Sequence, residues 1–351
     1  MQTLHDSLPA EAQAKLLPNK KVTGFTTDDD GVTVTCADGS TYSGTIIVGA
    51  DGAHSTVRRL MREKALLQPR TAAELKVEQI INEEKPFLTT YRAMWIRFPT
   101  VRPLIQPGDA SETHGKDCTL QLFAGEDTSV IGIYERMDKP TREGVRYTQQ
   151  DEEKFIERWG RLPIVKGYTI QDAYTNRTQA GMVNLEEGIL KRWSWERIVL
   201  AGDAAHKFTP STGAGCNNGI VDVVALANEL YHAFRVVREE GGPEAFPDKD
   251  QILAAFNDYQ QARFEHVKDG LEGASEATGA ATWSDITHRF VDRHVLSRPS
   301  LVKFFATRSA AATAKTPVFE YVEGEEQMIG KFPWAHPIKE VGSKAAGSKA
   351  G

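Results

Sequence analysis

The sequence predicts a mixed α/β (α+β) fold in which a ligand-binding domain is interrupted by a mostly antiparallel sheet. Two short apolar runs, 46–50 and 197–202, each lead into a turn that contains Asp and Gly. Between them, residues 85–150 carry β-rich runs separated by Gly, Pro and Asp, and residues 219–275 then show apolar residues at helical spacing. This order indicates two ligand-facing turns with a sheet inserted between them.

The composition is that of a globular protein with at least one sizeable core. The 351 residues carry a net charge of -6 without a basic block, so we do not expect nucleic acid as a partner. No apolar run approaches the ~20 residues of a transmembrane helix, and residues 1–20 lack the pattern of a signal peptide. The cysteines Cys36, Cys118 and Cys216 lie far apart, as in a reducing compartment. We therefore expect a cytoplasmic protein.

The predicted elements follow in order along the chain. Residues 1–20 are expected to form an amphipathic helix, and three β runs follow, joined by the turns DDDG and ADGS: Val22 to Thr27, Val32 to Cys36 and Thr45 to Val48. The runs TTYRAMWIRF, CTLQLFAG and SVIGIYERM then predict an antiparallel sheet, and residues 151–164 a helix. Helices within 219–275 are expected to cover the strand that leads to Asp203.

These patterns predict a discontinuous domain and an insertion. The expected parts are 1–64 with 186–275 for the ligand-binding domain, 65–185 for a β-rich substrate domain, 276–340 for a C-terminal helical region and 341–351 for a disordered tail.

The first motif that could carry chemistry is IIVGADGAHSTVRR, residues 46–59. A β-branched strand runs into Asp51 and Gly52, and a helix start follows. Backbone amides there, together with Arg58 or Arg59, could hold an anion such as a phosphate. An ordinary connection from strand to helix explains the same residues, and both interpretations stay open.

The second motif, GDAAHKFTPSTGAGCNNG, places Asp203 just beyond a buried strand, where α/β sheets bind ligands. Its carboxylate could accept hydrogen bonds from a ribitol or ribose chain. Pro210 restricts the loop, while Gly213 and Gly215 allow the backbone to approach a flat ligand. A helix expected from about Asn217 would direct its positive end at that ligand. A plain helix-entry loop is again the alternative.

Two histidines, His54 and His206, lie inside these motifs. Neither has companion ligands at a metal-binding spacing, so we expect hydrogen-bonded structural residues and no metal site. The glycines of GAGCNNG do not fit the dinucleotide fingerprint GxGxxG.

Taken together, the motifs resemble the class A FAD-dependent monooxygenases of the para-hydroxybenzoate hydroxylase fold. The resemblance rests on the segments VGADGAHSTVR, AGMVNLEEGILKRWSWERIVL and AGDAAHKFTPSTGAGCNNGIVDVVALAN. Within that family the chain is most similar to fungal epoxidases and hydroxylases of terpenoid and indole-terpenoid secondary metabolism. The resemblance implies FAD as cofactor, NAD(P)H as reductant, and O₂ and a small hydrophobic terpenoid or aromatic metabolite as substrates.

The resemblance also implies roles for individual residues. Asp203 would bind the FAD ribitol, and Asp51 would be associated with FAD binding and with the use of NAD(P)H. Arg58 and Tyr91 would be catalytic or face the substrate. The other implied cofactor-binding positions are Gly52, Pro210, Gly213, Gly215, Cys216 and Asn217. The family motif GQGxN reads here Gly213-Ala214-Gly215-Cys216-Asn217, with a cysteine where a small residue is usual.

A larger departure concerns the family's opening βαβ unit with GxGxxG, which does not occur in this sequence. The chain thus looks N-terminally truncated relative to the family, without the ADP half of the site, and we expect an exposed sheet edge. The favoured hypothesis is an FAD-dependent monooxygenase. The alternatives are a truncated, cofactor-poor remnant without activity, and a flavin oxidase or dehydrogenase. The sequence indicates neither the oligomeric state nor the exact substrate.

Overall fold

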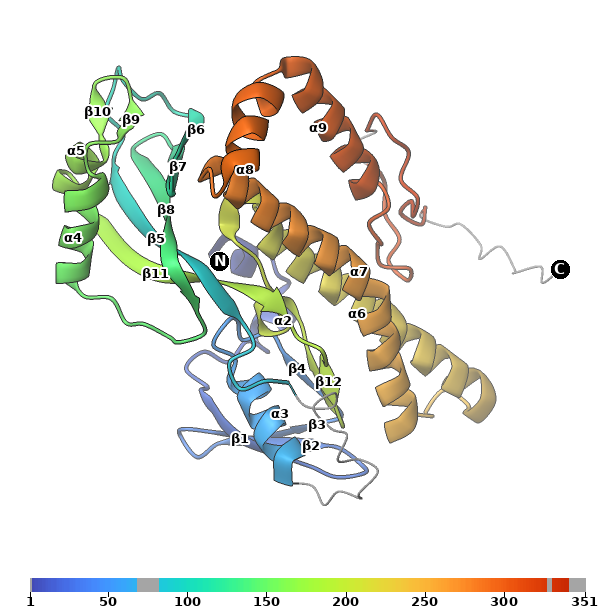
Figure 1. Cartoon of the computed structure of the whole chain (residues 1–351). Helices are drawn as coiled ribbons and strands as arrows, with labels where there is room; N and C mark the ends of the chain where they lie inside the picture. The colour runs from blue at the N-terminus through green and yellow to red at the C-terminus, as the bar shows by residue number, and fades with distance from the viewer. Residues whose placement is uncertain (1, 68–81, 327–329, 341–351) are drawn as a thin grey trace.

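The computed structural model describes residues 2–67, 82–326 and 330–340. One part of the fold is a six-stranded sheet with helices on its outer face, and the other consists of short sheets covered by two long helices (Figure 1). The mixed α/β class predicted from the sequence is confirmed.

The large sheet has the strand order β14-β11-β5-β8-β7-β6, and all of its pairings are antiparallel. Its strands are β5 (Leu88–Pro99), β6 (Ala110–Gly115), β7 (Cys118–Ala124), β8 (Thr128–Thr141), β11 (Gln179–Ile189) and β14 (His206–Lys207). The three predicted β runs lie in β5, β7 and β8. Strand β6 was not predicted, because its sequence ASETHG is polar and lacks β-branched apolar residues.

The two faces of this sheet differ because successive side chains of a strand alternate. Met94, Ile96 and Phe98 of β5 are fully buried against a layer of two helices. These helices are α4 (Gln149–Trp159) and α5 (Ile170–Thr175), next to the small hairpin of β9 (Pro163–Val165) and β10 (Tyr168–Thr169). The opposite face carries Ala93, Gln121 and Tyr134, and it is the one that faces the candidate site.

The predicted helix over 151–164 is displaced toward the N-terminus. Thr148 and Asp151 form a reciprocal capping box that starts α4 at Gln149. The helix ends at Trp159, since Gly160 follows and Pro163 already begins β9.

A second sheet positions the motif around Asp203. Strand β13 (Ile198–Leu200) pairs in parallel with β4 (Ile47–Gly49) and antiparallel with β12 (Ser194–Trp195). All three residues of β13 are fully buried. In the described part of the chain β4 is one edge of this sheet, and Val48 is 43% exposed.

The N-terminal predictions need correction. A three-stranded antiparallel sheet contains β1 (Val22–Thr27), β2 (Val32–Cys36) and β3 (Thr41–Gly44), and α3 (Thr56–Leu67) packs nearby. The predicted strand Thr45 to Val48 instead begins at Ile47, and the exposed strand β3 was missed. The single predicted helix over 1–20 is two short helices, α1 (Gln2–Asp6) and α2 (Ala10–Gln13), with Pro9 between them and no buried residue.

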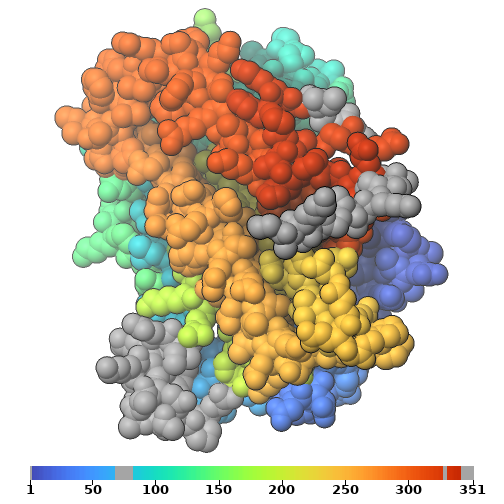
Figure 2. Space-filling model, turned by 90° about the vertical axis from the view of Figure 1, so that its right-hand side faces the viewer, coloured from blue at the N-terminus to red at the C-terminus, as the bar shows by residue number. Residues whose placement is uncertain are grey.

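Two long helices cover the buried strand β13, as predicted. They are α6 (Ala214–Gly241) and α7 (Lys249–Ala281), which run side by side (Figure 1). The chain continues through α8 (Ile286–Val291), the π-helical turn η4 (Asp292–Leu296) and α9 (Pro299–Thr313). Figure 2 shows that these helices and the pair α6 and α7 lie on the same face of the molecule. The tail 341–351 lies outside the described residues, and no described helix is long and apolar enough to cross a membrane.

Candidate cofactor turn and adjoining cavity

Asp203 lies in the one-turn 3-10 helix η2 (Gly202–Ala204), directly after the buried strand β13. Its carboxylate receives no hydrogen bond from the residues that the structure describes. One carboxylate oxygen lies 3.9 Å from the position that a Cβ on Gly215 would occupy. The turn therefore presents an unpaired carboxylate toward the first turn of α6, and the predicted position of Asp203 directly after a buried strand is confirmed.

A buried ionic cluster holds this turn against α6. The Gly202 backbone amide donates to Asp222 Oδ2 at 2.9 Å, and His206 Nε2 lies 2.6 Å from the same oxygen. Arg263 Nε donates to Asp222 Oδ1 at 2.8 Å. Burial acts to raise the pKa of Asp222, but the hydrogen bonds from His206 and Arg263 outweigh it and the pKa is lowered. His206 is thus a hydrogen-bonded structural residue, as expected.

The start of α6 also fits the prediction, although it lies earlier than expected. A second 3-10 turn, η3 (Pro210–Thr212), leads into Gly213, whose φ of 64° is the left-handed conformation that glycine adopts readily. The helix begins at Ala214, three residues before the predicted Asn217, because this turn replaces the expected loop. Within the described residues no side chain caps its N-terminus, so its first amides can bind a ligand.

In the first motif, the carboxylate of Asp51 is hydrogen-bonded by residues of the same motif. Asp51 accepts hydrogen bonds from the Ser55 hydroxyl and from the amides of Thr56 and Val57, at the start of α3. Its carboxylate therefore caps this helix. A cofactor role for Asp51 and the adjacent Gly52 stays a prediction.

Arg58 links the two motifs. Its guanidinium donates to the Ala204 carbonyl at 2.9 Å and to the Ala53 carbonyl at 2.5 Å, and it lies over the Phe87 ring. The first of these bonds reaches the residue after Asp203. The structure thus brings Arg58 and the Asp203 turn together, while a catalytic role for Arg58 stays a prediction.

Tyr91 and His54 have different surroundings. Tyr91 is buried in β5, with its hydroxyl 3.3 Å from the Thr282 hydroxyl, and burial raises its pKa. Its substrate-facing role stays a prediction. His54 is exposed and makes no hydrogen bond within the described residues, so the expectation of a hydrogen-bonded structural role was wrong for this residue.

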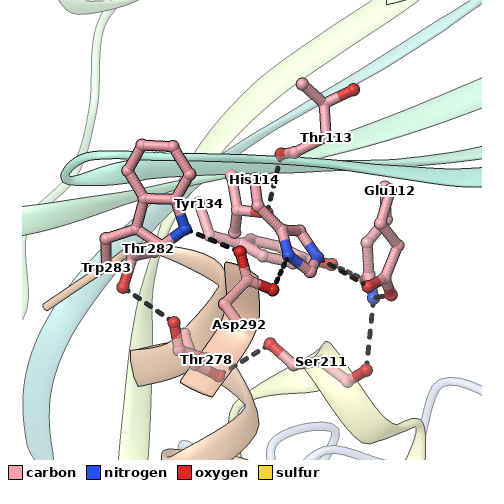
Figure 3. Close-up of polar contacts among 11 residues, drawn as sticks. Glu112, Thr113, His114, Tyr134, Ser211, Thr278, Thr282, Trp283 and Asp292 are labelled. Carbon is pink, nitrogen blue, oxygen red and sulfur yellow. Dashed lines mark hydrogen bonds and ion pairs between the residues drawn. The ribbon is translucent and has the colours of Figure 1, made fainter. Parts of the chain in front are cut away.

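A cavity of about 120 Å³ lies between the inner face of the large sheet, η3 and α7. Its polar side chains come from the sheet and from Ser211, and its apolar lining comes mainly from small residues of α7. Figure 3 shows His114 between Glu112 and Asp292, with Ser211 beside Thr278. The sequence patterns did not predict these cavity residues. The only signal was the polar alternation Glu112, His114 in a segment that was not predicted as a strand.

The residues of the turn fit the ribitol and ring portions of FAD. The unpaired carboxylate of Asp203 can accept hydrogen bonds from ribitol hydroxyls. The uncapped amides of α6 can meet a ring that carries negative charge, and Gly215 leaves space for it. Pro210 and the exposed Cys216 and Asn217 lie on the same turn.

Comparison with known protein families gives one match, to the family described as FAD binding domain, over residues 2–246. Among curated proteins, the FAD-dependent monooxygenase spyC of Aspergillus fumigatus is 32% identical over 279 residues. This alignment covers 78% of the chain and 56% of spyC. The FAD-dependent monooxygenase ausM of Penicillium brasilianum is 28% identical, with 84% of the chain and 60% of that protein covered. The chain thus spans somewhat over half the length of these two relatives.

Solved structures share the fold. HpxO of Klebsiella pneumoniae, solved as a variant with FAD, has a TM-score of 0.58 at 19% identity, with 83% of this chain and 67% of that chain covered. A substrate complex of salicylate hydroxylase has a TM-score of 0.57 at 18% identity, with 85% and 70% covered. At these identities the likeness concerns the fold alone.

Proposed function

Because the chain belongs to the FAD-binding-domain family of the FAD-dependent monooxygenases, as the sequence motifs predicted, we propose that it carries the ribitol- and ring-facing part of an FAD site. The full activity that we propose is oxygenation of a small hydrophobic terpenoid or aromatic metabolite, by epoxidation or hydroxylation. NAD(P)H would be the reductant and O₂ the oxygen donor. The names of the fungal relatives, FAD-dependent monooxygenases, support the oxygenation and the FAD part of this proposal.

The observation that carries the proposal is the unpaired carboxylate of Asp203 beside the uncapped N-terminus of α6. Asp203 would hold the ribitol, and the amides of α6 would stabilise negative charge on the ring. Bound FAD would supply the oxygen-transfer chemistry, so the chain needs no nucleophile or metal of its own. Ser211 of η3 lines the cavity and lies just before Gly213 and α6, so a substrate bound in the cavity would lie next to the proposed cofactor.

One observation favours a second candidate, a cofactor-poor protein without catalytic activity. The edge strand β4 has no partner on one side within the described residues, and Val48 is 43% exposed there. An FAD site that lacked its ADP-binding strand would lose several charge-assisted hydrogen bonds, each worth about 1.5 to 3 kcal/mol.

Titration of the purified chain with FAD distinguishes the two candidates. The proposal predicts a protein-bound flavin spectrum and NAD(P)H oxidation that depends on O₂. Asp203→Ala should weaken FAD binding, whereas Asp269→Ala at an exposed site on α7 should not. A colourless chain that cannot be loaded with FAD would support the inactive protein. A product that gains no oxygen atom would indicate an oxidase or dehydrogenase.

A further inference from the structure

The cavity behind η3 has an unusual hydrogen-bond balance. Its polar side chains are Glu112, His114, Thr119, Gln121, Tyr134 and Ser211. The hydroxyl of Tyr134 donates to Gln121 Oε1 at 2.8 Å. Gln121 Nε2 donates one N–H to Glu112 Oε1 at 2.5 Å and the other to the Ser211 carbonyl at 3.2 Å. Since a carboxylate only accepts, the amide group of Gln121 must turn its NH₂ toward Glu112. The phenol hydrogen of Tyr134 is therefore already used within the protein.

The hydroxyl hydrogens of the other lining residues are used in the same way. Thr119 Oγ1 donates to the Thr113 carbonyl at 3.0 Å. Thr278 Oγ1 lies 2.8 Å from the Ala274 carbonyl, 2.8 Å from the Thr209 hydroxyl and 2.6 Å from the Ser211 hydroxyl. In the arrangement in which Thr278 donates to the Ala274 carbonyl, the Ser211 hydroxyl donates to Thr278. Each of these oxygens keeps lone pairs that can accept a further bond.

The imidazole of His114 is also fully engaged. Its Nδ1 lies 2.7 Å from Asp292 Oδ1 and its Nε2 lies 3.1 Å from Glu112 Oε2. Both nitrogens face carboxylates, so both act as donors when the ring is protonated. Trp283 Nε1 donates to the other oxygen of Asp292 at 2.7 Å. Figure 3 shows these contacts from Trp283, just after α7, through Asp292 of η4 to His114 and Glu112 of β6.

Within the described residues, the polar side chains of the cavity thus offer acceptors and keep no hydrogen to donate. We infer that the cavity binds the hydroxyl or N–H end of an otherwise apolar molecule, with Glu112, Tyr134 and Ser211 as the acceptors, and that it discriminates against a carboxylate. That this molecule is the substrate rests on the proposed function. The acceptor character of the cavity does not. A site whose acceptors are already ordered strongly favours ligands that bring the matching donors.

The rest of the ligand has an apolar surface to lie on. Ala277, Ala280 and Ala281 of α7 line one side of the cavity. In the sheet, Glu112 pairs with Gln121, Gln121 with Gly132, and Gly132 with Trp95, so these residues form one row across four strands. Trp95, which is 37% exposed, lies in that row outside the residues that line the cavity, and the row continues to Gly181 of β11.

Three matched small probes test the inference on the purified chain without added FAD. They are para-fluorophenol, fluorobenzene and para-fluorobenzoate, whose binding is read from fluorine NMR line widths. The phenol should bind about tenfold more tightly than fluorobenzene, as expected for one hydrogen bond to a charged acceptor, and the benzoate more weakly than both.

Two variants locate the effect. Glu112→Gln replaces the charged acceptor with an amide, and Gly132→Ala adds a Cβ 2.9 Å from the Tyr134 hydroxyl, which must move. In either variant, para-fluorophenol should bind only about threefold more tightly than fluorobenzene, or less. Glu126→Gln, whose side chain is 74% exposed, is the matched control and should leave the advantage unchanged.

Any of three results would overturn the inference. These are benzoate binding as tight as phenol binding, a phenol advantage that survives in both folded variants, or the absence of binding of all three probes to the folded wild-type chain. Because no flavin is present, failure of FAD binding would leave these results intact and would count only against the proposed function.

Discussion

His206 Nε2 lies 2.6 Å from Asp222 Oδ2, and this contact joins the segment after β13 to helix α6. Asp222 is fully buried and also binds Arg263 and the Gly202 amide. One carboxylate therefore fixes the backbone on both sides of Asp203. The geometry of the cofactor turn depends on a residue that does not itself face the cofactor site.

Asp222→Asn should lower the free energy of unfolding by about 3 to 5 kcal/mol, because it leaves the buried guanidinium of Arg263 without a counter-charge. Urea unfolding followed by circular dichroism measures this loss. Asp269→Asn, at an exposed position of the neighbouring helix, is the control and should change stability by about 0.5 kcal/mol or less. Equal stability of the two variants would contradict the role given to the buried cluster.

His114 should make the stability depend on pH. Its hydrogen bond with Glu112, and then that with Asp292, raise its pKa above the usual 6.5, although burial opposes them. A group whose pKa is higher in the folded state than in the unfolded state stabilises the fold fully at pH values below its unfolded-state pKa. This stabilisation is lost as the pH rises through the folded-state pKa. The stability difference between wild type and His114→Gln should therefore shrink as the pH rises from about 5.5 to 9. A difference between wild type and His114→Gln that stays constant over this pH range would contradict the role given to His114.

Gly49 should not tolerate a side chain. A Cβ there would lie 2.7 Å from Leu200 Cδ2 and 2.8 Å from Val57 Cγ1, in the contact between β4, β13 and α3. We expect Gly49→Ala to destabilise the chain by about 1 to 3 kcal/mol through overpacking. Gly24→Ala in β1 is the matched control, because a Cβ at that position meets no atom within 4 Å. Thermal unfolding of both variants gives the comparison.

Substitutions of Asp51 and Asp203 should have different effects, one on the free energy of unfolding and the other on FAD affinity. Asp51→Ala removes the cap of α3 and should cost about 0.5 to 2 kcal/mol of unfolding free energy. Asp203→Ala removes no hydrogen bond among the described residues, so stability should change by no more than about 0.5 kcal/mol. FAD affinity, measured by quenching of flavin fluorescence, should fall about tenfold or more in Asp203→Ala. A fall in affinity limited to Asp51→Ala would reverse these assignments.

The sequence predicted the elements whose pattern is local. The strands β5, β7 and β8 show apolar and β-branched runs, and the buried strand β13 ends at the Asp- and Gly-containing turn. The long helices α6 and α7 follow from their periodicity. Strand β6 could not be found in this way, because it is stabilised by pairing with β7 and not by its own composition.

The candidate site was predicted only in part, for the same reason. Asp203, Gly213 and Gly215 lie within one short motif, so their association could be read from the sequence. The cavity residues Glu112 and His114 meet Ser211 and Asp292 through contacts that join segments about a hundred or more positions apart in the chain. Such pairs have no local signature, and without them the acceptor character of the cavity cannot be inferred.

The short turn η3 has a thermodynamic consequence. Its Ser211 lines the cavity, and Gly213, which follows η3, directly precedes the first turn of α6, where we propose that FAD binds. Any ordering of this turn by one ligand lowers the entropic cost of binding the other, so the two affinities are linked and the linkage is reciprocal. A donor-bearing ligand in the cavity should then tighten FAD binding by the same factor by which FAD tightens the ligand.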